Sequence, residues 1–271
     1  MQFSVLMSVY EKEKPDFLKS AIDSILNQSI KPDEIVIVKD GKLTKELDNV
    51  IDSYIEQNPN LFNIVELLEN KGLGTALAIG VEQCKNEIIA RMDTDDICVY
   101  NRFEKQLEIF RNNPNIALVG SCIDEFEGDI INKISVRTVP ENNQDIISYA
   151  KTRNPFNHMT VMYKKSEVIK AGNYKPFLWN EDYYLWVRMI VDKNEFYNIQ
   201  ESLVQARAGN EMFERRGSFE YAKQDIKLQI EFYKLGFINK SQAISNSIKR
   251  SVVRVIPNKL RKLIYLKLLR N

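Results

Sequence analysis

The sequence predicts an α/β protein with a mostly parallel central sheet that is flanked by helices and followed by a basic helical extension. Two observations lead to this prediction. Over the first 92 residues, short apolar runs alternate with segments of helical periodicity. Such alternation builds parallel sheets with helices on both faces. After Glu231 no acidic residue occurs, and apolar residues again recur at helical spacing.

The first half should contain four strands and three helices. Asp16 is the expected N-cap of the first helix, because it precedes the first apolar residues of the helical period. Ligands of parallel sheets bind beyond the carboxyl ends of the strands, so the loops after these strands are the expected site. The expected strands are 3–9, 34–38, 62–67 and 87–92, and the expected helices are 16–28, 44–57 and 72–85.

In the second half, strand and helix patterns no longer alternate regularly. This half should complete the same sheet with an α+β arrangement. A hairpin is expected to turn at residues 127–129, since Glu-Gly-Asp separates two apolar runs. The expected elements are a helix over 102–113, strands over 116–121 and 158–166, and a helix over 180–190 with two apolar segments after it. We divide the chain into a domain of residues 1–238, with halves of about 1–120 and 121–238, and a tail of residues 239–271.

Composition indicates a folded globular protein. The chain has 271 residues, of which 44% are hydrophobic and 28% charged, which allows one full core. Cys84, Cys98 and Cys122 have no metal-binding spacing, so we expect reduced thiols in a reducing compartment. We also expect no secretory leader and no membrane span, since no apolar run of about 18 residues occurs.

The net charge of +1 conceals an asymmetry along the chain. Residues 232–271 carry ten basic residues and no acidic one, which leaves a charge of −9 on residues 1–231. The sequence therefore describes an acidic body with a basic tail.

Three carboxylates follow the expected strand 87–92: Asp93, Asp95 and Asp96. If strand alternation continues, Asp93 and Asp95 point the same way and Asp96 points to the opposite side. Two converging carboxylates favour a hard divalent cation such as Mg²⁺ or Mn²⁺. The alternative is that these acids cap the next helix and face water.

Polar residues also follow the first two strands. Ser8, Tyr10 and Asp40 should share a sheet edge with Asp93, where Tyr10 can stack on a nucleotide base and Asp40 can accept a hydrogen bond from it. No glycine loop of the GxGxxG or GxxxxGK[ST] type is present. The segment 70–76 either lets a ligand approach its backbone closely or forms a simple tight turn.

A fourth acid lies on a helix of the second half. Asp182 shares one face with Leu185, Trp186 and Met189, so its carboxylate should point inward. Burial would raise its pKa, which suits a general base. Asn180 can cap this helix, and the helix dipole would then lower the pKa of first-turn acids. The alternative is that Glu181 and Asp182 are ordinary first-turn acids.

These segments together resemble family 2 glycosyltransferases, in the branch of bacterial exopolysaccharide and O-antigen biosynthesis. The resemblance covers about residues 3–235, and it implies a GT-A fold with a Rossmann-like sheet. It also implies transfer of a sugar from a nucleotide diphosphate with inversion at the anomeric carbon. The segments that carry it are SVY, VKDG, NKGLGTALAIG, ARMDTDD, NRFEKQ, NHMTVMYKKS, GNY and NEDYYLW.

The resemblance also implies a role for each site residue. Asp95 would bind Mn²⁺ or Mg²⁺, and Asp93 would lie at the ribose and the metal. Asp182 would deprotonate the acceptor hydroxyl, and Glu181 would orient the acceptor. The remaining donor contacts are expected from Ser8, Tyr10, Asp40, Lys71, Gly72 and Arg91, with Asp40, Ser8 and Tyr10 around the base, usually uracil.

Two departures from the wider family stand out. The second strand ends in VKDG, where many members have two consecutive acids, so we expect fewer contacts to the base. The QxxRW element of processive synthases is missing. Arg215 or Arg216 occupies a comparable position and would either close over the diphosphate or belong to a basic surface loop. His158 and Trp179 are further candidates for acceptor or diphosphate contacts; His158 could instead touch the metal or be structural.

The tail combines apolar and basic residues. Pro257 separates a first helical segment from a second basic, apolar one. Such a pair can lie in a membrane interface, where each basic residue near anionic lipid contributes about 1 kcal/mol. The alternative is a helix packed on the domain, and the acidic body argues against nucleic acid. The apolar residues of the first segment are Ile244, Ile248, Val252 and Val255.

The predicted function is metal-dependent, inverting transfer of a hexose from a UDP-sugar to a lipid-diphosphate-linked sugar acceptor in surface polysaccharide biosynthesis. The enzyme would act as a peripheral protein on the cytoplasmic face of the inner membrane. A nucleotidyltransferase is one alternative, since it also uses strand-end aspartates and a metal. The other is a sugar-nucleotide-binding, membrane-associated protein without turnover.

Overall fold

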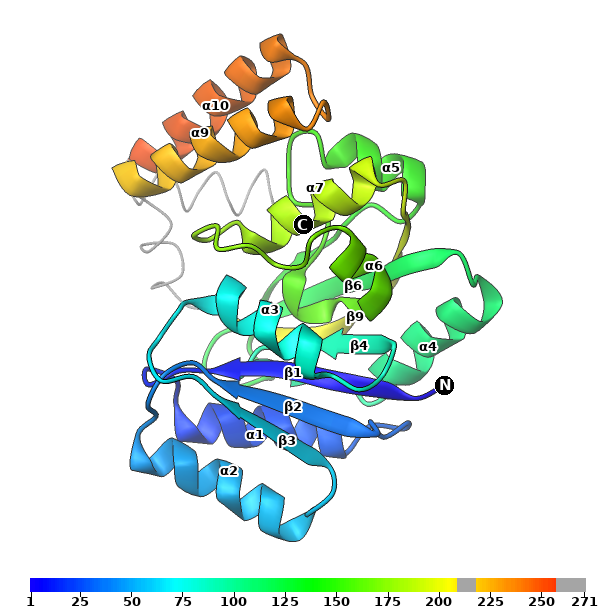
Figure 1. Cartoon of the computed structure of the whole chain (residues 1–271), viewed down its shortest axis with the longest axis vertical. Helices are drawn as coiled ribbons and strands as arrows, with labels where there is room; N and C mark the ends of the chain where they lie inside the picture. The colour runs from blue at the N-terminus through cyan, green and yellow to red at the C-terminus, as the bar shows by residue number, and fades with distance from the viewer. Residues whose placement is uncertain (209–217, 257–271) are drawn as a thin grey trace.

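The computed structural model describes residues 1–208 and 218–256 (Figure 1). Within them a single mixed sheet has the strand order β3-β2-β1-β4-β8-β6-β9-β5, with β7 paired to β6. The strands are β1 (Phe3–Val9), β2 (Glu34–Lys39), β3 (Phe62–Glu66), β4 (Ile88–Arg91), β5 (Ile97–Cys98), β6 (Ile116–Phe126), β7 (Lys133–Arg137), β8 (Met162–Lys164) and β9 (Glu195–Arg207).

Helices cover both faces of this sheet, as the alternation of strands and helices predicts (Figure 1). Side chains of β1 alternate between two cores: Phe3 and Val5 pack in the core under α1 and α2, and Leu6 packs in the core under α3 and α7. The helices are α1 (Pro15–Leu26), α2 (Lys45–Gln57), α3 (Leu73–Gln83), α4 (Arg102–Asn112), α5 (Asn143–Tyr149), α6 (Lys165–Lys170), α7 (Glu181–Val191), α9 (Phe219–Lys234) and α10 (Lys240–Val255).

The N-terminal half is a parallel sheet of β3, β2, β1 and β4. The predicted elements are all present, and one helix start differs from the prediction. Pro15 occupies the first position of α1 and Lys14 is the N-cap, so Asp16 lies in the first turn and does not cap the helix. Proline is well placed there because the first helical N–H has no intrahelical acceptor.

The C-terminal half completes the same sheet, as expected, but two of its elements differ from the prediction. Residues 158–166 do not form one strand. Thr160 donates hydrogen bonds from its N–H and its Oγ1 to the Asn157 carbonyl, at 2.9 and 2.8 Å, and so closes a 3₁₀ turn before the short β8. The two apolar segments after α7 form a single strand, β9, which follows β6 in parallel through register shifts.

The two last described helices lie side by side at one end of the molecule (Figure 1). Their contact includes a buried ion pair, in which Asp225 of α9 accepts hydrogen bonds from Arg250 Nε at 2.9 Å and Arg254 Nε at 2.7 Å. The tail therefore begins as a helix, as predicted, and packs on α9. Its second segment, residues 257–271, lies outside the described residues, and the division into domains stays a prediction.

The three cysteines are buried and form no disulfide. Among residues 1–208 and 218–256, no helix is both long and apolar enough to cross a bilayer.

Replacement of Gly80 by alanine tests the contact between α3 and the sheet. An added Cβ would overlap the Leu6 side chain and lie 2.9 Å from Val38 Cγ2. Helix propensity alone predicts that Gly80→Ala raises the free energy of unfolding by about 1 kcal/mol. We expect the overlap to dominate and lower it by about 1–3 kcal/mol. Urea unfolding followed by circular dichroism measures the change, and a more stable variant would contradict the packing described here.

Candidate active site

The carboxyl ends of β1, β2 and β4 meet at one edge of the sheet and bring predicted site residues together. The loop after β4 is tied to β1 by the Met92 N–H, which donates to the Leu6 carbonyl at 3.1 Å. The loop after β2 is tied to β1 by the Asp40 N–H, which donates to the Val9 carbonyl at 2.8 Å. Ser8, Tyr10, Asp40 and the aspartates after β4 thus share this edge, as predicted.

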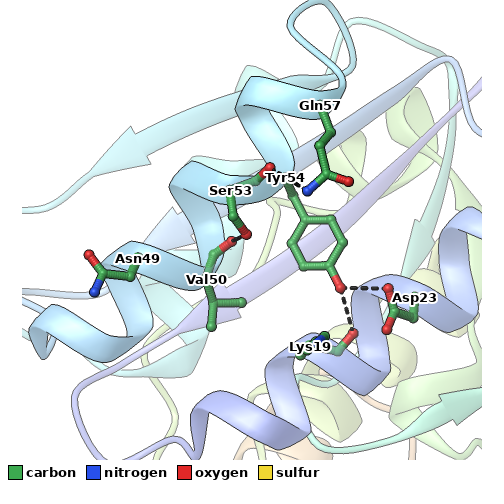
Figure 2. Close-up of a pocket in the computed structure, with 7 residues that line it drawn as sticks. All are labelled: Lys19, Asp23, Asn49, Val50, Ser53, Tyr54 and Gln57. Atoms are coloured by element: carbon green, nitrogen blue, oxygen red, sulfur yellow. Dashed lines mark hydrogen bonds between the residues drawn. The ribbon is translucent and has the colours of Figure 1, made fainter.

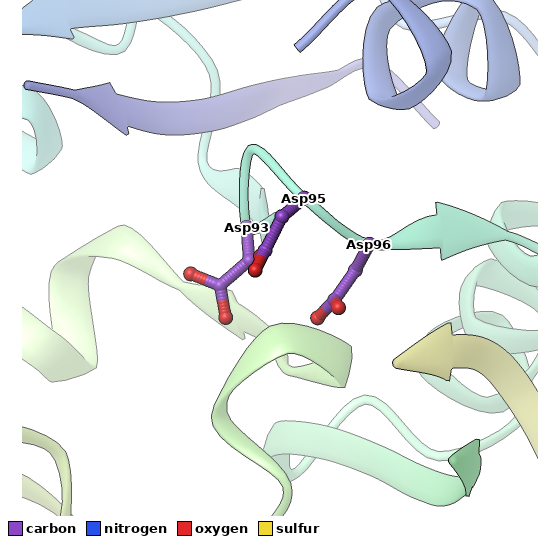
Figure 3. A group of neighbouring side chains, drawn as sticks. All are labelled: Asp93, Asp95 and Asp96. Atoms are coloured by element: carbon purple, nitrogen blue, oxygen red, sulfur yellow. The ribbon is translucent and has the colours of Figure 1, made fainter. Parts of the chain in front are cut away.

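Three carboxylates converge in the loop after β4 (Figure 3). One carboxylate oxygen from each of Asp93, Asp95 and Asp96 lies within 4.8 Å of the others. The prediction that Asp96 points to the opposite side is wrong. β4 ends at Arg91, so the alternation of a strand does not extend into this loop, which turns all three carboxylates to one side.

Two arginines hold this carboxylate cluster, which we define as Asp93, Asp95 and Asp96. The buried Arg91 forms an ion pair with Asp93. Arg207 binds the other two residues through its backbone and side chain: its N–H donates to Asp96 Oδ1 at 2.8 Å, and its Nε donates to the Asp95 carbonyl at 3.3 Å. Asp96 and Arg207 are functional candidates that sequence reasoning missed. Arg207 lies 111 residues from Asp96, so no local pattern reports the contact.

Burial and mutual repulsion raise the pKa values of Asp95 and Asp96. Burial, together with the charge of Asp93, raises the pKa of Asp95 to about 6. Burial and the charges of Asp95 and Asp93 raise the pKa of Asp96 well above its ordinary value. Asp96 Oδ2 is buried and has no hydrogen-bond partner among the described residues. Converging oxygen donors with an unsatisfied buried atom fit a hard divalent cation, which would relieve the repulsion.

Asp40 organises the loop that precedes α3. It is buried, and its two carboxylate oxygens accept hydrogen bonds from the N–H groups of Lys71 at 2.7 Å and Gly72 at 3.0 Å. Gly72 has a φ of +82°, a conformation that glycine adopts without strain. Asp40 therefore fixes the backbone of the predicted donor contacts Lys71 and Gly72. Its contact with a base stays a prediction, as do those of the half-buried Ser8 and Tyr10.

A second pair of acids lies at the start of α7. Asp182 Oδ2 accepts a hydrogen bond from Asn154 Nδ2 at 2.6 Å, and Asp182 Oδ1 accepts one from the Tyr183 N–H at 2.6 Å. Both oxygens are thereby held in one orientation. Asn154 is a further residue that sequence reasoning missed, because it lies in a loop 28 residues from Asp182.

At Glu181 and Asp182, burial affects the pKa more than the helix dipole does. Asn180 is the N-cap residue but makes no capping hydrogen bond through its side chain. Burial raises the pKa of Asp182, and burial together with the Asp182 charge raises the pKa of Glu181 to about 7. Leu185, Trp186 and Met189 are fully buried, which confirms the predicted inward face.

Arg91 connects the two acidic groups electrostatically. Its charge lowers the pKa values of Glu181, Asp182 and Asp95, and the charge of Asp93 raises that of Glu181. These interactions indicate that the α7 acids lie near Arg91 and Asp93, so that a carboxylate with a raised pKa neighbours the carboxylate cluster.

The remaining predicted contacts have different surroundings. His158 Nε2 lies 3.0 Å from the Tyr174 hydroxyl, and its ring packs against Tyr174 and Trp186. Burial and the Arg91 charge lower the pKa of His158 well below its ordinary value, so its imidazole is neutral. Trp179 has a φ of +63° and stacks on Tyr221, with ring centroids 3.6 Å apart. Arg215 and Arg216 lie outside the described residues.

A separate pocket of about 420 Å³ lies between α1 and α2 (Figure 2). The Tyr54 hydroxyl donates to Asp23 Oδ1 at 2.5 Å across it. None of the predicted site residues lines this pocket. It is lined by Lys19, Asp23, Asn49, Val50, Ser53, Tyr54 and Gln57.

The raised pKa of Glu181 makes stability depend on pH. The folded state holds this proton up to a pKa of about 7, against an ordinary value of 4.5, so the free energy of unfolding falls as pH rises through this range. With chelator present, we expect Glu181→Gln to be more stable than the unsubstituted protein by about 3 kcal/mol near pH 8, and equal to it near pH 4. Chemical unfolding at both pH values measures the difference.

The exposed Glu56 of α2 provides the control for this experiment, since Glu56→Gln should change stability little at either pH. A Glu181→Gln variant that is less stable near neutral pH would show that the charged carboxylate is favoured in the fold, contrary to our expectation.

Known proteins resemble this chain over nearly its whole length. A UDP-Gal:alpha-D-GlcNAc-diphosphoundecaprenol beta-1,3-galactosyltransferase of Escherichia coli is 40% identical over 271 residues, covering 99% of this chain and 97% of that protein. The amylovoran biosynthesis glycosyltransferase AmsE of Erwinia amylovora is 37% identical over 266 residues, covering 97% of each chain.

Solved structures with low sequence identity share the fold. S. aureus TarS 1-349 in complex with UDP-GlcNAc matches with a TM-score of 0.69 at 15% identity, covering 99% of this chain and 76% of that one. The mannosyltransferase PcManGT from Pyrobaculum calidifontis matches with a TM-score of 0.65 at 12% identity, covering 98% of this chain and 81% of that one. The family model for glycosyl transferase family 2 matches residues 4–169. This chain therefore belongs to glycosyl transferase family 2.

Proposed function

We propose that this glycosyltransferase moves a hexose from a UDP-sugar to a sugar on a lipid diphosphate, with inversion at the anomeric carbon. The observation that carries the proposal is the pairing of two acidic groups at one sheet edge. The carboxylate cluster suits a divalent cation, and the buried Asp182 suits a base. The 40% identical E. coli relative, whose name gives UDP-Gal and a GlcNAc-diphosphoundecaprenol acceptor, supports both substrate classes.

The donor would bind at the ends of β1, β2 and β4. Asp95, with Asp93 and the newly found Asp96, would hold Mn²⁺ or Mg²⁺, which when bound neutralises charge on a departing diphosphate. The loop fixed by Asp40 presents the backbone of Lys71 and Gly72 to the same edge. Tyr10 and Ser8 would line the base, and Arg91 would keep Asp93 oriented through their ion pair.

Asp182 would accept the proton of the acceptor hydroxyl. Asn154 and the Tyr183 N–H each hold one of its oxygens, so the carboxylate keeps its orientation as the proton moves. Burial raises its pKa, which increases its affinity for a proton. One base opposite the leaving group gives direct displacement and inversion, and no second carboxylate nucleophile is needed. Glu181, next in the chain, would orient the acceptor.

The reaction would occur at a membrane, because the acceptor is linked to a lipid. We place the enzyme on the cytoplasmic face of the inner membrane as a peripheral protein, with contact through the tail of residues 239–271. The basic character of the tail supports this placement, since anionic lipids attract clustered lysine and arginine.

The activity is tested by incubating the protein with UDP-sugars, Mn²⁺ and a synthetic lipid-diphosphate sugar. We expect UDP release that requires the acceptor and stops when a chelator is added. Quantification of UDP and of the lengthened lipid-linked saccharide measures the reaction. Release of pyrophosphate would instead indicate a nucleotidyltransferase, and binding of UDP-sugar without any release would indicate a protein without turnover.

Replacement of Asp182 by asparagine tests the base. We expect Asp182→Asn to lower the rate of transfer about 100- to 10,000-fold, because the amide cannot accept the proton. The affinity for UDP, measured by titration calorimetry, should stay nearly unchanged. Asp192, exposed at the end of the same helix, gives the matched control Asp192→Asn, which should retain full activity. Full activity of Asp182→Asn would refute the assignment.

A further inference from the structure

The last two described helices expose apolar side chains in two regular stripes. On α9, Ile226, Ile230 and Tyr233 follow one another at helical spacing and are 40%, 46% and 49% exposed. On α10, Ile244, Ile248 and Val252 do the same and are 53–60% exposed. We call these six residues the α9–α10 outer face.

The contacts between the two helices explain why these side chains remain outside. Arg250 and Arg254 of α10 bind the fully buried Asp225 of α9. Asn246 donates hydrogen bonds to Gln229 Oε1 at 2.9 Å and to the Lys151 carbonyl at 2.8 Å. Polar and ionic contacts therefore attach α10, and its apolar stripe points away from the domain. A helix that packs on a soluble domain normally has the reverse arrangement.

Exposed lysines border the outer face. Lys223 and Lys227 lie three residues before Ile226 and Ile230, and side chains three or four residues apart are neighbours on a helix. Lys234 lies four residues after Ile230, Lys240 lies four residues before Ile244, and Lys249 lies three residues before Val252. In residues 218–256 seven basic residues face three acidic ones: Lys223, Lys227, Lys234, Lys240, Lys249, Arg250 and Arg254 against Glu220, Asp225 and Glu231.

We propose that the α9–α10 outer face docks on an anionic lipid surface, with its apolar side chains in the interface and the bordering lysines at the headgroups. Exposed apolar side chains at regular helical spacing, bordered by lysines, are typical of interfacial helices. Charge decides between lipid and a second copy of the chain. Two copies of the same basic face repel each other, whereas anionic headgroups complement it.

This inference changes which residues make the membrane contact. Arg250 and Arg254 are occupied by Asp225, and Lys234 pairs with Glu231. Lys223, Lys240 and Lys249, and not these arginines, would therefore meet the headgroups. Half of the surface belongs to α9, which precedes the basic tail. The inference refines the membrane partner of the proposed function, but its test needs neither donor nor acceptor.

Vesicle binding of the full chain tests the proposal. The protein is sedimented with vesicles of phosphatidylcholine alone and with vesicles of equal parts phosphatidylcholine and phosphatidylglycerol. We expect binding to the anionic vesicles that weakens with salt, and a partition coefficient at least about tenfold lower for the double variant Ile230→Asp/Ile248→Asp. Both positions are exposed, so circular dichroism should show an unchanged fold.

The double variant Ile169→Asp/Val191→Asp serves as the matched control. Ile169 of α6 and Val191 of α7 are 41% and 39% exposed, and the change in net charge is the same. We expect this control to bind vesicles like the unsubstituted protein. Equal loss of binding in both double variants, or no loss in the outer-face variant, would overturn the proposal.

Two additional measurements separate the remaining outcomes. Sedimentation equilibrium without lipid should give the same mass for all variants; a dimer that only the outer-face variant loses would assign the surface to a second copy and overturn the proposal. UDP release with a water-soluble acceptor should be equal in the outer-face variant and the unsubstituted protein. Vesicle binding without any UDP release would refute the proposed function and leave the docking surface supported.

Discussion

The convergence of three carboxylates after β4 is the interaction on which the rest of the site depends. Asp93, Asp95 and Asp96 repel one another, and burial makes the charges of Asp95 and Asp96 more costly. Arg91 and Arg207 offset part of this cost through an ion pair and through bonds to Asp95 and Asp96. The pKa values of Asp95 and Asp96 remain raised even so. A divalent cation and the phosphates of a donor would complete the site.

Arg91 gives this cluster a connection to the α7 acids. It is buried beneath the site, and two of its guanidinium nitrogens, Nε and Nη1, have no partner among the described residues. Its charge favours the ionised forms of Asp95, Glu181 and Asp182. The carboxylate cluster and the α7 acids are thus coupled through one buried cation, and Asn154 completes the orientation of Asp182.

Much of the fold follows from local patterns in the sequence. The strands and helices of the first half were predictable because buried strands and amphipathic helices have distinct periods. The carboxyl ends of parallel strands meet at one edge of the sheet, and this rule also placed Ser8, Tyr10, Asp40 and Asp93 together. The direction in which the Asp96 side chain points was not predictable, because it depends on the residue at which β4 ends. The contacts of Arg207 and Asn154 were also out of reach, since each joins segments far apart in the chain.

In the tail as well, the local helical pattern was predictable and the tertiary contacts were not. Its helical period predicted α10, but whether the apolar stripe faces the domain or the solvent depends on Asp225 of α9. That helix was not predicted, and a buried aspartate with two arginine partners cannot be recognised from spacing. The ion pairs turn Arg250 and Arg254 inward and leave Ile244 and Ile248 outside, which reverses the usual arrangement of an amphipathic helix.

The most direct test of the central claim is the anomalous diffraction of crystals grown with manganese and UDP. We expect a manganese peak in direct contact with a carboxylate oxygen of Asp95 and with the UDP phosphates. A map with UDP bound at the ends of β1 and β2, and with no manganese peak beside Asp93, Asp95 or Asp96, would contradict it.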